Sequence, residues 1–247
     1  MSEQQPRVVV ARASDEHGEI ALATRGDVTE LIVDGVFAMD TVDTTTERAL
    51  ARLALDRLPG DGLRVLVGGL GLGFTVRALL QDPRVAHVDV VELHAPLVAW
   101  ARAGTVPPLV GLLDDPRVAV QVADVLAAVP ALPHAGLDAI LLDVDNGPGF
   151  LVHPANAAVY RLPFLAAAAR ALAPGGVLAI WSADPAPSLA DELAHLGALE
   201  TVTLDVARDD RTFSYTLYLT RTAPAPQAPL SHSPTQRPSG SLTRGDG

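Results

Sequence analysis

The sequence predicts an α/β protein: a mainly parallel sheet covered by helices on both faces, with a small β-appendage before it. Short apolar runs alternate with helical patterns from residue 63 to residue 220, and this alternation specifies a doubly wound sheet. Three of the predicted strands end at an acidic residue, namely Glu92, Asp124 or Asp143. Because ligands bind beyond the carboxyl ends of such strands, these acids predict one shared site.

The first 45 residues predict the β-appendage. Three alternating runs rich in Val, Ile and Thr, at 7–12, 19–24 and 29–33, are separated by turn formers such as Asp34-Gly35. Residues 44–58 then show the apolar spacing of a helix, which Pro59-Gly60 ends. We therefore divide the chain into an appendage (1–45) and a nucleoside-binding domain (46–221).

The stretch 63–80, LRVLVGGLGLGFTVRALL, is the centre of the predicted domain. Residues 64–67 predict a buried strand and residues 74–80 a helix, joined by a turn that contains Gly69, Gly71 and Gly73. Glycine lets the backbone turn sharply and lets a ligand approach without meeting a Cβ atom. A second strand, 87–91, ends at Glu92, about 20 residues after the turn, where an acid can accept hydrogen bonds from ribose hydroxyls. The unit predicts a nucleoside site.

The rest of the domain continues the alternation of strands and helices. Apolar or alternating runs predict strands, and wider apolar spacing predicts helices. The predicted strands are 118–122, 137–142, 177–181, 200–207 and 213–220, and the predicted helices are 95–103, 156–173 and 188–196. Residues 222–247 are rich in Pro, Ser, Thr and Gly, and this composition predicts a disordered tail.

Composition narrows the classes of partner. The formal net charge of −11 argues against nucleic acid, because phosphate binding requires basic patches. The basic residues are all Arg, so a lysine Schiff base is excluded, and without Cys there is no disulfide or thiolate chemistry. No apolar run approaches the roughly 18 residues of a membrane span, and the first ten residues do not resemble a secretory signal. We expect no membrane partner and a cytoplasmic location.

Several segments in order resemble the S-adenosylmethionine-dependent transferases, and within that fold the spermidine synthase (polyamine aminopropyltransferase) family. They are LIVDGVFAMDTVD, GLGLGFTVRALL, VDVVEL, DDPRVAVQVADVL, LDAILLDVDNGP and LAPGGVLAIWS, and the resemblance covers roughly residues 20–221. It implies a seven-stranded sheet of the S-adenosylmethionine-dependent methyltransferase type. It also implies decarboxylated S-adenosylmethionine or S-adenosylmethionine as cofactor, no metal, and a small-molecule amine acceptor. A homodimer is the assembly suggested by analogy.

The resemblance also implies roles for individual residues of the nucleoside site. Gly69, Gly71 and Gly73 would lie against the adenosine and sulfur end of the ligand. Glu92 would hold the ribose hydroxyls. Asp124 would accept a hydrogen bond from the adenine amino group, and Val125 would supply a backbone N–H.

Asp143 falls where the family keeps its catalytic aspartate, and Asp145 is the reserve candidate. The chain departs from the family at the glycine turn, where Leu72 replaces the aspartate that grips the donor's amino group. Aminopropyl transfer to an amine, with Asp143 taking the proton, is therefore the first hypothesis. A methyltransferase using the same nucleoside site and a non-catalytic nucleoside-binding protein are the two alternatives.

Overall fold

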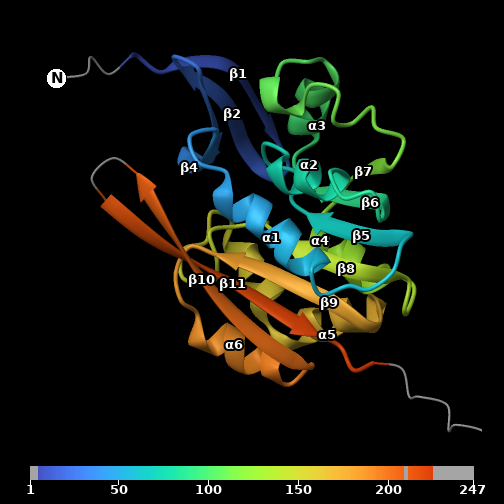
Figure 1. The fold of residues 1–247 in the computed structure, drawn as a ribbon. Coiled ribbons are helices and arrows are strands. Elements are labelled where there is room, and N and C mark those ends of the chain that lie inside the picture. Colours follow the sequence, from blue (N-terminus) through green and yellow to red (C-terminus); the bar gives the residue numbers. More distant parts are fainter. Residues whose placement is uncertain (1–4, 209–210, 225–247) are drawn as a thin grey trace, which may run out of the picture.

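The computed structural model describes residues 5–208 and 211–224, and within them the chain forms two sheets (Figure 1). The N-terminal sheet is antiparallel, with strands in the order β1 (Val8–Asp15), β2 (Gly18–Arg25), β3 (Val28–Val33) and β4 (Val36–Asp40). The larger sheet has seven strands in the order β10-β11-β9-β8-β5-β6-β7. Its five strands from β9 to β7 are parallel, and β11 is antiparallel to both β9 and β10. The predicted doubly wound, mainly parallel, seven-stranded sheet is confirmed.

The strands and helices of the larger domain alternate as predicted, and their bounds are as follows. The strands are β5 (Leu63–Gly68), β6 (Val85–Glu92), β7 (Val118–Val122), β8 (Leu137–Leu142), β9 (Leu172–Ser182), β10 (Ala198–Arg208) and β11 (Arg211–Arg221). The α-helices are α1 (Thr45–Leu55), α2 (Phe74–Leu80), α3 (Ala95–Arg102), α4 (Val125–Ala128), α5 (Leu162–Ala171) and α6 (Pro187–Ala194).

Two hydrophobic clusters lie on opposite faces of the seven-stranded sheet. Val65, Val67 and Leu141 of the sheet pack with residues of α1, α2 and α3. Leu66 and Ile140, which alternate with them along the strands, pack with residues of α4, α5 and α6. Because both faces are buried, the central strands are apolar throughout, as parallel strands require. No helix among the described residues is long and apolar enough to span a bilayer.

The predicted helix over 156–173 is wrong in its extent. A 3-10 segment, Pro154–Tyr160, comes first, Arg161 is extended, and α5 begins only at Leu162. Pro163 lies in the first turn of α5, where a missing N–H costs nothing, whereas in the middle of a longer helix it would break a hydrogen bond. The Pro174-Gly175-Gly176 segment belongs to β9 instead of lying outside it.

The fourth strand of the N-terminal sheet was not predicted. β4 has the sequence VFAMD, whose Ala, Met and Asp have little strand preference. It forms because Asp34 and Gly35, both with positive φ, reverse the chain and place it against β3. Thr222 and Ala223 hydrogen bond to Gly176 and Gly175 beside the start of β9. The remainder of the predicted tail, from residue 225, lies outside the described residues.

Candidate nucleoside and amine site

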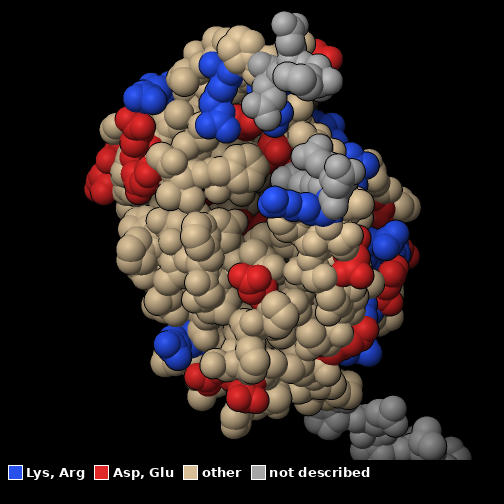
Figure 2. All heavy atoms as spheres, turned by 90° about the vertical axis from the view of Figure 1, so that its left-hand side faces the viewer, with Lys and Arg blue, Asp and Glu red and all other residues tan. Residues whose placement is uncertain are grey.

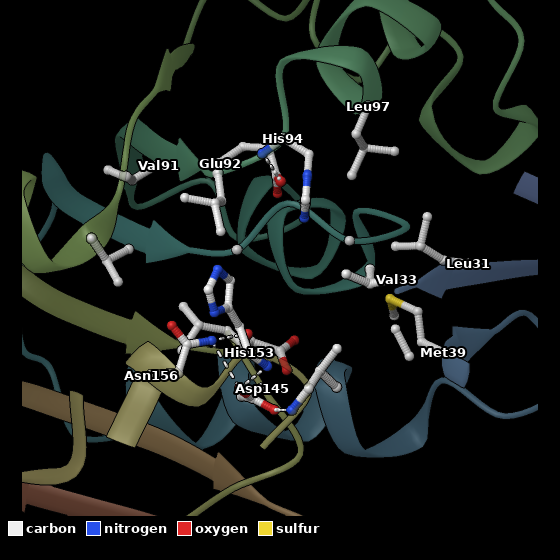
Figure 3. Close-up of a pocket in the computed structure, with 18 of the residues that line it drawn as sticks. Leu31, Val33, Met39, Val91, Glu92, His94, Leu97, Asp145, His153 and Asn156 are labelled. Atoms are coloured by element: carbon white, nitrogen blue, oxygen red, sulfur yellow. Dashed lines mark hydrogen bonds between the residues drawn. The ribbon is translucent and has the colours of Figure 1, made fainter. Parts of the chain in front are cut away.

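A cavity lies beyond the carboxyl ends of β5, β6 and β8, between the two sheets (Figure 3). Seven of the eight residues predicted for the site line it: Gly69, Gly71, Glu92, Asp124, Val125, Asp143 and Asp145. In Figure 3, Glu92 and His94 enter from one side, and Asp145, His153 and Asn156 enter from the opposite side. Leu31, Val33 and Met39 of the N-terminal sheet close a third side.

The glycine turn between β5 and α2 is held by close packing. A Cβ atom on Gly69 would lie 2.3 Å from the carbonyl oxygen of Asp143, so glycine is needed where β5 and β8 end side by side. Gly73, the eighth predicted residue, does not line the cavity. A Cβ atom there would lie 2.4 Å from Leu109 Cδ2, and its φ is +79°. Its role is to let α2 pack against the segment that contains Leu109.

Glu92 ends β6 and is 5% exposed. Its Oε2 accepts a hydrogen bond from the N–H of Leu70 at 2.8 Å, and its Oε1 accepts one from the N–H of His94 at 2.8 Å. Burial raises the pKa of this carboxyl group, while the backbone N–H donors oppose the rise. Glu92 thus fixes the glycine turn, and its carboxyl group lies at the cavity wall, where it can still accept a hydrogen bond from a ligand hydroxyl.

Asp124 follows β7 and begins α4. Its Oδ1 accepts a hydrogen bond from the N–H of Leu126 at 2.8 Å, which makes it the N-cap of that helix. The neighbouring side chain of Val125 is buried and lies in the apolar wall of the cavity. The cap holds the carboxylate at the cavity edge, at the same end as Glu92.

Asp143 follows β8 at the other end of the cavity. The hydroxyl of Thr75, on α2, donates to its Oδ2 at 3.2 Å. Burial, and then the negative charge of Glu47 in the first turn of α1, raise the pKa of Asp143 to about 7, against the opposing hydrogen bond from Thr75. At neutral pH this carboxyl group is therefore divided between its two protonation states.

Asp145 has a different environment, although it is only two residues away. Its Oδ1 accepts from the N–H groups of Asn146 and Val152, at 2.8 and 2.6 Å. Its Oδ2 accepts from Asn156 Nδ2 at 2.8 Å and from the N–H of His153 at 3.3 Å. With four donors on two oxygens, the carboxylate organises the loop after β8.

The structure adds three residues that sequence reasoning missed. The imidazole of His94 lies 3.2 Å (Nδ1) from Oδ2 of Asp15, at the end of β1, and so ties the N-terminal sheet to the cavity. His153 and Trp181 both line the cavity. Their ring nitrogens, Nδ1 of His153 and Nε1 of Trp181, are buried and have no hydrogen-bond partner among the described residues. The only sequence signal for His94 was its position two residues after the predicted Glu92. His153 lies eight residues after Asp145 and had no such signal.

Leu72 does not line the cavity. It is fully buried in the cluster that contains α1 and α2, and its N–H donates to Sδ of Met39 at 3.2 Å. The acid that stands beside Asp143 in this chain is Glu47, from a different element.

No Arg or Lys belongs to the cavity lining among the described residues, whereas Glu47, Glu92, Asp124, Asp143 and Asp145 all do. The cavity is therefore suited to a ligand with positive charge. The described residues contain no group of three or more His, Asp or Glu side chains that could hold a metal ion.

Solved structures resemble the fold. A crystal structure of spermidine synthase in complex with the transition-state analogue AdoDATO aligns with a TM-score of 0.74 and 19% identity, over 87% of this chain and 74% of that one. The spermidine synthase of Thermotoga maritima aligns with a TM-score of 0.74 and 18% identity, over 87% and 73%. At these identities the likeness concerns the fold.

Sequence relatives connect the chain with two kinds of transferase. It is 33% identical over 180 residues to a polyamine aminopropyltransferase of Mycobacterium tuberculosis, covering 72% of this chain and 33% of that protein. It is 33% identical over 129 residues to putrescine N-methyltransferase 4 of Nicotiana tabacum, covering 52% and 32%. The chain thus spans about a third of the length of these curated relatives. The model of the spermine/spermidine synthase domain matches residues 31–206. The chain belongs to the spermine/spermidine synthase family.

Proposed function

We propose that this protein transfers an aminopropyl group from decarboxylated S-adenosylmethionine to a small-molecule amine. The observation that supports this most is the distribution of charge in the cavity. Glu92 and Asp124 lie at one end, Asp143 and Glu47 lie at the other, and no Arg or Lys lines it among the described residues.

This charge distribution favours the decarboxylated donor over the ordinary one. Decarboxylated S-adenosylmethionine has only positive charges in its aminopropyl arm, whereas the ordinary compound also has an α-carboxylate. Near Asp143 and Glu47 that carboxylate would be repelled, since like charges about 4 Å apart in partly desolvated surroundings repel by several kcal/mol. Glu47 thus supplies an acid for the donor's amino group, in place of the aspartate that Leu72 replaces in the glycine turn.

The nucleoside end fits an adenosyl ligand on three grounds. Gly69 and Gly71 expose backbone at the cavity wall, Glu92 has lone pairs for ribose hydroxyls, and Val125 adds an apolar surface for the base. When bound, the donor supplies a carbon activated by its sulfonium group, so the protein must mainly align the partners and remove a proton.

Asp143 is the proposed base. A pKa of about 7 is close to the ideal value for general acid–base catalysis at neutral pH. As the amine nitrogen forms its bond to carbon and the carbon–sulfur bond breaks, the carboxylate takes the proton released from nitrogen. We assign Asp145 a positioning role instead, because four loop donors already occupy its oxygens. Metal ions have no part in this proposal.

Methyl transfer from S-adenosylmethionine is the second candidate function. It is favoured by the 33% identity to a putrescine N-methyltransferase over 129 residues. The two reactions share the nucleoside end of the cavity and the proton acceptor. They differ in the donor and in the nucleoside released.

Incubation with each donor and a mixture of amines, followed by mass analysis of the nucleosides, tests the proposal. Methylthioadenosine released from the decarboxylated donor is the expected product. S-Adenosylhomocysteine from the ordinary donor would instead establish the methyltransferase. If neither nucleoside appears and both donors still bind, the chain is a non-catalytic nucleoside-binding protein. A homodimer and a cytoplasmic location remain predictions from sequence.

A further inference from the structure

A second chamber adjoins the cavity on the side of Asp143. It has a volume of about 540 Å³ and shares Ala38, Met39, Glu47, Asn146 and Trp181 with the first cavity. Its walls come from β4, the start of α1, the loop after β8, the end of β9, and the β10–β11 hairpin. Figure 2 shows this side of the molecule. The middle of this face consists mostly of uncharged residues, with a few acidic side chains among them.

The β10–β11 hairpin covers one side of this second chamber. β11 pairs with β9 only from Thr216 to Arg221, so its first half is held by β10 alone. Val206 of β10 and Tyr215 of β11 lie in this part of the hairpin and line the chamber. This part of the hairpin has no backbone pairing with β9, and the ring of Tyr215 instead contacts the ring of Trp181 on β9.

Aromatic side chains are concentrated around the second chamber. The chain has two Trp, three Tyr and five Phe, and four of these ten line it: Phe37, Phe150, Trp181 and Tyr215. The ring centroids of Trp181 and Tyr215 lie 5.4 Å apart and the ring planes are tilted by 30°, so the two rings are in contact and form one continuous aromatic wall. Phe37 and Phe150 are 41% and 54% exposed. Exposed phenyl rings gathered at one hollow indicate a surface that binds an apolar group.

The charges of the second chamber are arranged around this apolar surface. Glu47 lies at the junction with the first cavity, beside Asp143. Asp40 and Asp43 each accept a backbone N–H of their own turn, from Val42 and Thr45, at 2.9 and 2.8 Å. Asp184 also lines the chamber and is exposed. An amine placed at the junction would therefore have its nitrogen near Asp143, the proposed base, and its remaining atoms against aromatic rings.

We propose that the second chamber binds the acceptor, and that the acceptor is a primary amine with an apolar, aromatic body rather than a short unbranched diamine. This rests on the proposed function. A four-carbon diamine would leave most of the aromatic wall in water, whereas a phenyl or indole ring would cover it. Burial of such a ring against the wall favours the arylalkylamine by roughly 10- to 100-fold in kcat/KM.

The test compares putrescine, spermidine, 2-phenylethylamine and tryptamine as acceptors, with decarboxylated S-adenosylmethionine as donor. Methylthioadenosine release and the mass of the alkylated amine are measured. We expect kcat/KM for the two arylalkylamines to exceed that for putrescine by at least about tenfold. Binding of 2-phenylethylamine to the methylthioadenosine-saturated protein is measured by calorimetry, so that recognition is tested separately from turnover.

Phe150→Ala removes an exposed ring of the second chamber and leaves the core intact. It should lower kcat/KM for the arylalkylamines by roughly 5- to 20-fold through KM, and lower the ratio of arylalkylamine to putrescine turnover. Phe150→Leu should recover part of this loss. Phe213→Ala is the matched control, since Phe213 is 41% exposed and lines neither chamber; it should retain the wild-type ratio.

The two proposals fail in different ways. Putrescine or spermidine turned over in preference to the arylalkylamines would overturn the acceptor inference and leave aminopropyl transfer standing. Turnover of no amine would overturn the proposed function, and the calorimetry then decides the inference. Saturable binding of 2-phenylethylamine that Phe150→Ala weakens supports it, and no binding refutes it.

Discussion

Replacing Asp143 with Asn should strongly lower turnover and at the same time stabilise the folded protein at alkaline pH. Both effects have one cause, the burial of a carboxylate beside Glu47. Asn has nearly the same shape and can still accept the hydrogen bond from Thr75, but it can neither ionise nor take a proton. Adenosyl ligand binding should therefore persist, while turnover falls by about 10²- to 10⁴-fold, as for other removed general bases.

The magnitude of the stability effect follows from the pKa. The carboxyl group has a pKa of about 7 in the folded protein and 3.8 as the reference for the unfolded chain. The folded state therefore binds the proton more tightly, and the free energy of unfolding falls as the pH rises from about 4 to 7. One pKa unit corresponds to about 1.36 kcal/mol, so the full penalty above pH 7 is at most about 4 kcal/mol. Between pH 5 and pH 8 the wild type should lose about 2 to 3 kcal/mol that the variant does not lose.

Urea denaturation of both proteins at pH 5, 6, 7 and 8 measures this difference. Asp114→Asn is the control, because Asp114 is exposed and outside both chambers; it should follow the wild type at every pH. Glu47→Gln removes the neighbouring charge, so the pH at which turnover is half-maximal should fall below that of the wild type. Parallel stability curves for the wild type and Asp143→Asn would refute the perturbed pKa. Wild-type turnover in Asp143→Asn would refute the role as base.

Four further changes test the rest of the site and the domain limits. Glu92→Ala should lower adenosyl ligand affinity by 10-fold or more in calorimetry, since hydrogen bonds to a charged group contribute about 1.5–3 kcal/mol; unchanged affinity would exclude the ribose contact. Asp15→Asn should weaken the same affinity by roughly 2- to 10-fold through His94, and an unaltered Kd would show that the N-terminal sheet does not influence the cavity. Gly73→Ala should lower the melting temperature by several degrees, because its φ of +79° and the contact with Leu109 are both unfavourable for Ala. Truncation after Pro224 should shift the melting temperature by no more than about 2 °C, since polar Pro-rich segments bury little, and a larger loss would mean that the tail packs on the body.

Sequence alone was sufficient where the signal is local. The buried strand Leu137–Leu142 and the helix Phe74–Leu80 have the predicted bounds, since an apolar run or a glycine turn shows its character within a few residues. The acids at the ends of β6, β7 and β8 were predicted to share a site because parallel strands end at one edge of a sheet. The structure places all three around one cavity.

Tertiary structure decided what depends on residues far apart in the chain. Thr75 and Asp143 are 68 residues apart, and Asp15 and His94 are 79 apart, yet each pair is joined by a hydrogen bond. The different surroundings of Asp143 and Asp145 also depend on folding. One carboxyl group lies beside a buried charge from α1, while loop donors surround the other. A pKa is set by burial and by charges within a few ångströms, and no spacing along the sequence contains those distances.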